Sequence, residues 1–558
     1  MIASPRTMFV ACVLAIGCAA PARAQDDPHA GGVGTHAYVP EELLTRPIAV
    51  RSGIGNSRDS VTSASAEARA FYVQGLNYLE SYVWIEAARS FHQALRYDPD
   101  LAMAYIGLSR VHSGLDDGAG AKGYCTMARD RAARASAAER RRIDIRERQL
   151  ASMDSLTNAA LFIAYKKAID DALSDRMDDL ELWLLRGNAE ESNASGRGQR
   201  GTAGSVAFYE AILRAQPDHA SAHHYLIHSY ETIGRIDQAL AHGEAYARLA
   251  PAIPHAAHMW GHDLRRVGRV NDAIAMFIRA DSLERAYYRT EDLEPSLDWH
   301  HGHNLDLLAS CYQHKGQMAR AEERMRESGS LRLVDDYRAF NRREWPNFLI
   351  HRGRHAEALE AARAMARTEY PGARTVGHAL AGQALLALGR EDEAAKELEA
   401  AQTALETVPL VAPGLIPRRS GVAPWVEGLR GELLLRTGNA KEAKPILEGV
   451  VRTMRSIPGP DAWSQTLFRL ETMARSAREA GDWALAEHIA DQMIDHDAAY
   501  GGSHVARALA LHHRNDAAGH RREMAEARRL WRDADPQLAE LEGAPKRGSV
   551  QTAKRRPE

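Results

Sequence analysis

Residues 220–253 read ASAHHYLIHSYETIGRIDQALAHGEAYARLAPAI, and residues 254–287 follow without a gap as PHAAHMWGHDLRRVGRVNDAIAMFIRADSLERAY. Each of these units has a central glycine, Gly234 or Gly268, and an alanine five residues after it. A glycine can end a first helix in the left-handed conformation, and a small residue lets a second helix pack closely against it. The stretch therefore predicts two consecutive helix-turn-helix units.

The same spacing recurs on both sides of this stretch. Residues 68–101 form an earlier unit with Gly75, Ala87, Ala94 and Pro99, and a degenerate unit begins near Trp183. Later units have central glycines, each with an alanine five residues further on: Gly316 and Ala321, Gly353 and Ala358, Gly389 and Ala394, Gly438 and Ala443, Gly481 and Ala486. An atypical unit near Asn515 is expected to cap the far end. The composition, rich in Ala, Leu, Arg and Glu, also favours helix throughout.

This pattern resembles the tetratricopeptide repeat (TPR) family, whose units are helix pairs of about 34 residues. The resemblance covers nearly all of residues 65–530. It implies an all-α fold, a right-handed α-solenoid of TPR-like repeats over residues 65–535. It also implies a concave groove of the kind that repeat solenoids use to hold a peptide or a protein.

The first 24 residues have the features of a secretory signal peptide. Arg6 supplies a positive charge, residues 8–20 form an apolar stretch too short to span a bilayer, and residues 22–24 end in a small-x-small pattern. We therefore expect cleavage after Ala24 and a periplasmic or secreted protein. A competing interpretation is a lipoprotein signal, with a lipid anchor on Cys18.

The two ends of the mature chain differ from the repeats. Residues 25–64 are polar with scattered Gly and Pro, which favours a flexible leader, and residues 536–558 form a basic tail that we expect to be disordered. No segment after the signal has the roughly 18–20 apolar residues of a transmembrane helix.

Cysteine content and charge exclude two further classes of protein. Cys12 and Cys18 lie in the signal, and Cys125 and Cys311 are widely separated, so a disulfide framework is not indicated. The net charge of −3 becomes −5 when the two arginines of the signal are removed. No global positive field is then available to attract nucleic acid.

Histidines recur in register in the two abutting units. His224 and His228 occupy positions five and nine of the first unit, and His258 and His262 occupy the same positions of the second. Residues four apart on a helix have Cβ atoms about 5–6 Å apart, and packed helices lie about 8–10 Å apart. The two pairs can therefore converge on one transition-metal ion, such as Zn, Cu, Ni or Fe.

The TPR resemblance adds further residues to this candidate metal site. It implies that positions two, five, nine, twelve and thirteen face the groove, which places His255 beside the two pairs. The unit that starts at Gly302 has His303 at position two and Asp306 at position five. The block at 254–262 also resembles a histidine-bearing block of some exported bacterial TPR proteins. In their later block a second histidine stands where this chain has Asp306. The predicted metal ligands are His224, His228, His258, His262, His255, His303 and Asp306.

Three functions stay open from the sequence. The groove can belong to a binding scaffold that holds a metal, to a metal-dependent enzyme, or to a metal-free module for a peptide, a protein or a small ligand. For an anionic ligand, Arg266 and Arg343 would assist. The sequence has no GxSxG elbow, Walker loop, HExxH or CxxC, so it names no reaction.

The signal peptide gives a direct prediction about the mature protein. Mass spectrometry of protein purified from its native host should find Gln25 at the amino terminus, because cleavage follows the small residue Ala24. A mature terminus at a lipidated Cys18 would contradict this and establish the lipid anchor.

Overall fold

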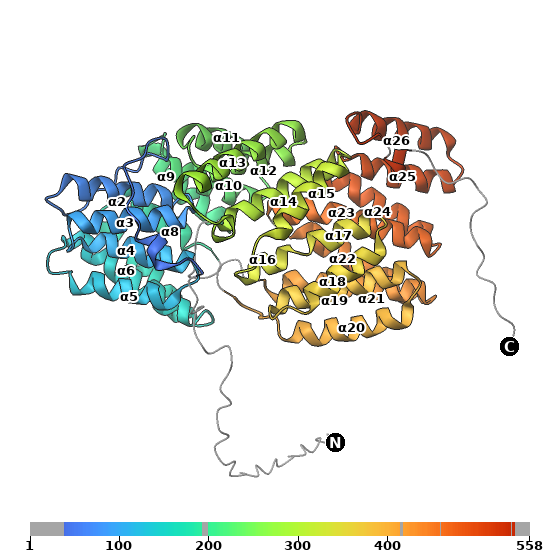
Figure 1. Cartoon of the computed structure of the whole chain (residues 1–558), viewed down its shortest axis with the longest axis horizontal. Coiled ribbons are helices and arrows are strands. Elements are labelled where there is room, and N and C mark those ends of the chain that lie inside the picture. Colours follow the sequence, from blue (N-terminus) through green and yellow to red (C-terminus); the bar gives the residue numbers. More distant parts are fainter. Residues whose placement is uncertain (1–37, 192–198, 413–416, 458, 537, 542–558) are drawn as a thin grey trace, which may run out of the picture.

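The computed structural model describes residues 38–191, 199–412, 417–457, 459–536 and 538–541 (Figure 1). Within these ranges the chain forms helices and turns and no β-strand. None of the helices there is long and apolar enough to cross a membrane. The predicted signal peptide and most of the predicted tail lie outside the described residues.

Successive helices pair antiparallel, and each pair packs against the next along the chain. The first pairs are α2 (Ala66–Leu79) with α3 (Trp84–Tyr97), α4 (Ala102–Gly114) with α5 (Gly118–Asp130), α6 (Ala137–Asp154) with α7 (Ala159–Asp175), α8 (Leu180–Asn188) with α9 (Ala203–Ala215), α10 (Ala220–Thr232) with α11 (Ile236–Leu249), and α12 (Pro254–Arg266) with α13 (Val270–Glu291).

The second half continues in the same way. Its pairs are α14 (Trp299–His314) with α15 (Met318–Ser330), α17 (Glu344–His351) with α18 (His355–Ala366), α19 (Pro371–Ala387) with α20 (Glu391–Glu406), α21 (Arg419–Arg436) with α22 (Ala440–Ser456), α23 (Pro460–Glu479) with α24 (Trp483–His496), and α25 (Gly501–His513) with α26 (Ala517–Leu530). Short helices α1 (Glu41–Leu44), η1 (Pro295–Leu297), α16 (Asp336–Asn341) and η2 (Ala539–Leu541) complete the described chain. The predicted all-α solenoid is confirmed.

The turns inside the pairs use the predicted left-handed residues. The central glycines of the seven units from Gly234 to Gly481 have φ between 71° and 84°, and Asn515 has φ 63°. The alanines that follow the glycines after five residues are almost completely buried, as Ala394 shows. Close approach also needs a small residue at Gly75, where a Cβ atom would lie 2.6 Å from the Phe91 ring. The glycines and alanines of the repeat thus determine both the backbone turn and the distance between the paired helices.

The predicted flexible leader differs from what the structure describes. Residues 38–64 follow a largely extended path, but Val39, Leu44 and Ile54 are buried in the core of the first repeats. The carbonyl of Gly53 accepts a hydrogen bond of 2.8 Å from the Ala252 amide. This part of the leader is held in place because its few apolar residues are buried and its backbone pairs with a distant repeat.

The solenoid also curls back on itself. Helix α23 contacts α12, α14 and α17, which come more than a hundred residues earlier in the chain. The Trp531 indole donates a hydrogen bond of 2.8 Å to the His314 carbonyl, and Leu538 is buried in the same core. Packing thus extends past residue 536, the predicted start of the tail. Helix α23 thereby covers α12 and α14, the first helices of two central repeats.

A pair of glycine substitutions tests the role of the turns. Gly389→Ala should lower the free energy of unfolding by about 1–2 kcal/mol, since its φ of 71° is unfavourable for a residue with a Cβ atom. Gly449→Ala, inside α22, should raise it by about 0.5–1 kcal/mol. Urea unfolding measures both values, and equal effects of the two substitutions would contradict the assignment.

Candidate metal centre

Helices α10, α12 and α14 lie side by side and carry seven histidines on surfaces that face one another. All seven side chains are buried, with at most 9% of each residue exposed. Helix α10 supplies His224 and His228, helix α12 supplies His255, His258 and His262, and helix α14 supplies His300 and His303. We call this set the histidine row.

The histidine row divides into three overlapping triads. They are His224, His228 and His255; His255, His258 and His300; and His258, His262 and His303. In each triad the potential ligand nitrogens all lie within 4.8 Å of one another. The first and third triads share no residue, and the middle one joins them. The structure therefore separates the two sequence pairs that we expected to meet at one ion, because His255 and His300 lie between them.

In the first triad, neighbouring groups determine which nitrogens carry hydrogen. The Nδ1–H of His224 donates to the Glu80 carbonyl at 2.7 Å, which leaves its Nε2 as a lone pair. That Nε2 lies 3.0 Å from the Nε2 of His255. The Nε2 of His228 is buried and has no hydrogen-bond partner among the described residues. The triad thus pairs the Nε2 atoms of His224 and His255 and leaves His228 Nε2 and His255 Nδ1 without a partner in the described residues.

The third triad repeats this arrangement. The Nδ1–H of His258 donates to Asn304 Oδ1 at 2.8 Å, and Asn304 is oriented by its own bond to the Phe277 carbonyl. The Nε2 of His258 is therefore a lone pair, and it lies 2.7 Å from the Nε2 of His262. On the other side of the triad, His303 Nδ1 lies 3.2 Å from the Tyr337 hydroxyl.

Glu231 lies next to both the first and the third triad, which we call the outer triads. Its two carboxylate oxygens lie 3.7 Å from His228 Nδ1 and 3.5 Å from His262 Nδ1. Both oxygens are buried without a hydrogen-bond partner in the described chain. If Nδ1 of each ring carries the hydrogen and faces this carboxylate, both Nε2 atoms are free to act as ligands. A carboxylate behind a histidine is the usual outer partner of a metal ligand.

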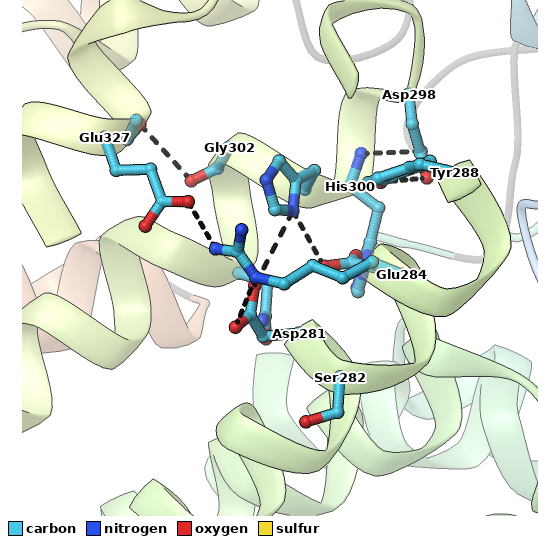
Figure 2. A network of polar contacts seen from close by, with 12 residues as sticks. Asp281, Ser282, Glu284, Tyr288, Asp298, His300, Gly302 and Glu327 are labelled. Carbon is cyan, nitrogen blue, oxygen red and sulfur yellow. Dashed lines mark hydrogen bonds and ion pairs between the residues drawn. The ribbon is translucent and has the colours of Figure 1, made fainter. Parts of the chain in front are cut away.

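Glu284 is the carboxylate on the Nδ1 side of the middle triad. Its carboxylate accepts a hydrogen bond from His300 Nδ1 and, at 3.0 Å, another from His301 Nδ1 (Figure 2). Burial alone would raise the pKa of Glu284, but the two histidines lower it to about 2. The opposite nitrogen of His300, Nε2, is buried with no partner in the described residues. Asp281, Glu284 and His301 form a further group with ligand atoms this close together.

Burial holds five histidines of the row in the neutral form. Burial lowers the pKa of His228 and of His303 to about 4, and it lowers the pKa of His224, His255 and His258 well below the usual range. A neutral imidazole is the form that binds a metal ion. At neutral pH these five histidines can thus bind a cation without first releasing protons.

The row is covered by other parts of the chain and does not line an open groove. Tyr82, in the turn between α2 and α3, packs its ring 4.7 Å from that of His224 and holds a φ of 59°, an unfavourable value for a tyrosine. Its carbonyl accepts a hydrogen bond from the Trp299 indole at 3.0 Å. On the far side, Asp461 of α23 lies 3.6 Å from His303. The expected open surface is therefore a buried centre, since the solenoid closes over it.

Comparison with known proteins adds little to this geometry. No protein-family model and no curated protein matches the chain. A chain of the APC/C hetero-tetramer Cut9–Hcn1 is 12% identical, with a TM-score of 0.32, over 85% of this chain and 96% of that chain. The human IFIT1 dimer with m7Gppp-AAAA is 12% identical, with a TM-score of 0.35, over 85% of this chain and 92% of that chain. Neither likeness assigns a function.

The structure brings together six of the seven predicted ligands, and Asp306 is the exception. Asp306 belongs to none of the groups found in the described chain. Burial raises its pKa to about 7, and it lies near Ser328 and Arg342. The repeat pattern did not predict a role in the site for His300, Glu231 or Glu284.

Two of these three could have been found in the sequence. Glu231 stands at position twelve of its unit, one of the positions that the TPR resemblance directs to the groove. His300 stands three residues before His303, a spacing that places two residues on one face of a helix. Because the repeat pattern starts its unit at Gly302, His300 lay outside that unit, but α14 in fact begins at Trp299.

The shifted histidines predict how stability depends on pH. Between about 6.5, the usual pKa of histidine, and about 4, the unfolded chain binds protons that folded His228 and His303 do not. The metal-free protein should therefore lose free energy of unfolding as the pH falls through this range, on the order of 3 kcal/mol for each residue. Urea unfolding across the range should show a shallower dependence for His228→Gln and His303→Gln. An unchanged slope in both variants would contradict the prediction.

Proposed function

We propose that this protein is an exported metalloprotein whose solenoid holds two transition-metal ions, one in each outer triad of the histidine row. The observation that carries the proposal is the pair of triads with no residue in common, each with buried and mutually facing nitrogens. An imidazole nitrogen that is buried without a partner costs free energy. A bound cation would satisfy these nitrogens together.

The donor set narrows the class of metal. All the ligands of the outer triads are imidazoles, which suit Zn, Cu, Ni and Fe. The two cysteines that remain after the signal, Cys125 and Cys311, are buried and free and belong to none of the groups. Three protein ligands leave one coordination position of a four-coordinate ion open, as in catalytic sites. The proposal therefore includes a centre at which a further small ligand can bind.

The outer partners support the same assignment. Glu80, Asn304 and Glu231 each place an acceptor against the Nδ1 side of a histidine. An acceptor on the Nδ1 side leaves Nε2 available to a metal ion, and metal-binding histidines usually have such an outer partner. A peptide-binding groove, the alternative from the sequence, would need these side chains to be accessible. They are buried, so the histidine row itself does not suit a peptide.

Metal stoichiometry tests the proposal. Protein dialysed against Zn(II) or Cu(II) should retain about two ions per chain by elemental analysis, one for each outer triad. His228→Ala should remove one ion, since His228 belongs to the first triad only, and His262→Ala should remove the other. His242→Ala is the matched control, because His242 pairs with His223 outside the row. It should retain both ions.

Other outcomes would contradict the proposal in different ways. If either substitution removed all the metal, the ions would share one site. If the wild type retained no more metal than a variant with alanine at His224, His228, His258 and His262, there would be no metal centre. Circular dichroism of each variant should show unchanged helix content, which separates loss of a ligand from loss of the fold.

A further inference from the structure

A cavity of about 220 Å³ reaches the histidine row from the surface. At its inner end are His255 and His300, which belong to the middle triad, together with Tyr82. All three residues are buried. At its outer end are Ala286 and Thr290, which are exposed on α13. The cavity therefore runs from solvent on the α13 side to the middle triad, which joins the two outer triads.

The charged groups at the cavity already have partners within the protein. Arg51 lies 2.8 Å from Glu291, and Arg89 lies 2.8 Å from Glu291 and 2.6 Å from Glu86. The third carboxylate, Asp298, accepts hydrogen bonds from the His300 amide at 3.0 Å and from the Tyr288 hydroxyl at 2.8 Å. No arginine of the lining is thus left for an anionic ligand, and both oxygens of Asp298 already accept hydrogen bonds. An anion would lose its hydration without gaining a cationic partner, and a cation would meet only carboxylates that already have partners in the protein.

Much of the remaining wall is aromatic and aliphatic. The cavity is lined by Tyr78, Tyr82, Tyr287 and Trp299, and by aliphatic residues such as Ile253 and Leu283. The rings of Tyr287 and Trp299 are fixed by hydrogen bonds to Glu86 at 2.8 Å and to the Tyr82 carbonyl at 3.0 Å. Flat, fixed aromatic walls favour a flat aromatic ligand, because rings stack at little cost in conformational freedom.

The volume limits the size of such a ligand. An engineered apolar cavity of about 150 Å³ is known to bind benzene, so a cavity of this size accepts one ring with a small substituent. We propose that the cavity is a binding site for a small, neutral molecule with a single aromatic ring, held next to His255 and His300. Contact of this molecule with a metal ion rests on the function proposed above, whereas occupancy of the cavity does not.

Three probes with the same ring and different charges test the proposal: phenol, benzoate and benzylamine. We expect ligand-detected NMR titration of the metal-free protein at neutral pH to show that phenol binds about ten-fold more tightly than benzoate or benzylamine. Each ion would lose its hydration on entering the cavity, which costs free energy. Ala286→Trp should block the mouth and weaken phenol binding by at least about ten-fold. Ala275→Trp, at an exposed position of the same helix away from the cavity, should leave the affinity unchanged.

A second measurement separates this inference from the metal proposal. In protein loaded with Cu(II), phenol should change the electron paramagnetic resonance spectrum, and it should fail to do so in Ala286→Trp. Equal binding of the three probes, tighter binding of an ion, or equal effects of the two tryptophan variants would overturn the assigned ligand class. Phenol binding without any change in the copper spectrum would overturn the contact with the centre. Absence of bound copper would refute the metal proposal alone, since the metal-free titration would still test the cavity.

Discussion

The structure depends on one constraint: seven imidazoles are buried together, and each of their nitrogens needs a partner. Protein groups satisfy much of one side of the row, as the Glu80 carbonyl does for His224 and the Asn304 side chain does for His258. On the other side of the row, imidazole nitrogens lie next to one another, as in the pairs His224 with His255 and His258 with His262. Some nitrogens of the row have no hydrogen-bond partner in the described chain, at a cost of roughly 1–3 kcal/mol for each unsatisfied group: His228 Nε2, His255 Nδ1, His262 Nδ1 and His300 Nε2. Bound cations would remove that cost, and this is the physical basis of the proposed function.

The repeat architecture is what places the row. A unit of fixed length returns the same helix face to the same side of the solenoid, so histidines at equal positions of α10 and α12 become neighbours across a helix contact. Departures from the repeat then complete the centre. Helix α13 extends to Glu291 and brings Glu284 to His300, and α14 begins early enough to include His300. The curl of the solenoid adds Asp461 from α23 and shields the row from solvent.

Local signals predicted the fold well, and the centre only in part. The glycine and alanine spacing is a local property, so the helix pairs and the left-handed turns from Gly234 to Gly481 follow from the sequence. The grouping of the histidines is not local. It depends on which rings intervene between the two pairs, and His255 and His300 do so. The enclosure of the row depends on contacts such as that of Tyr82 with His224, which are 142 positions apart in the chain and leave no periodic signal.

The most direct test of the metal centre is X-ray absorption spectroscopy of the protein loaded with Zn(II) or Cu(II). If the outer triads hold the ions, the first shell should contain nitrogen at about 2.0–2.1 Å, with the outer-shell scattering of about three imidazoles per ion and no sulfur. The His228→Ala and His262→Ala variants, each with one ion left, should give the same shell for that ion. A first shell of oxygen ligands with little imidazole scattering would show that metal binds elsewhere and would contradict the assignment of the histidine row.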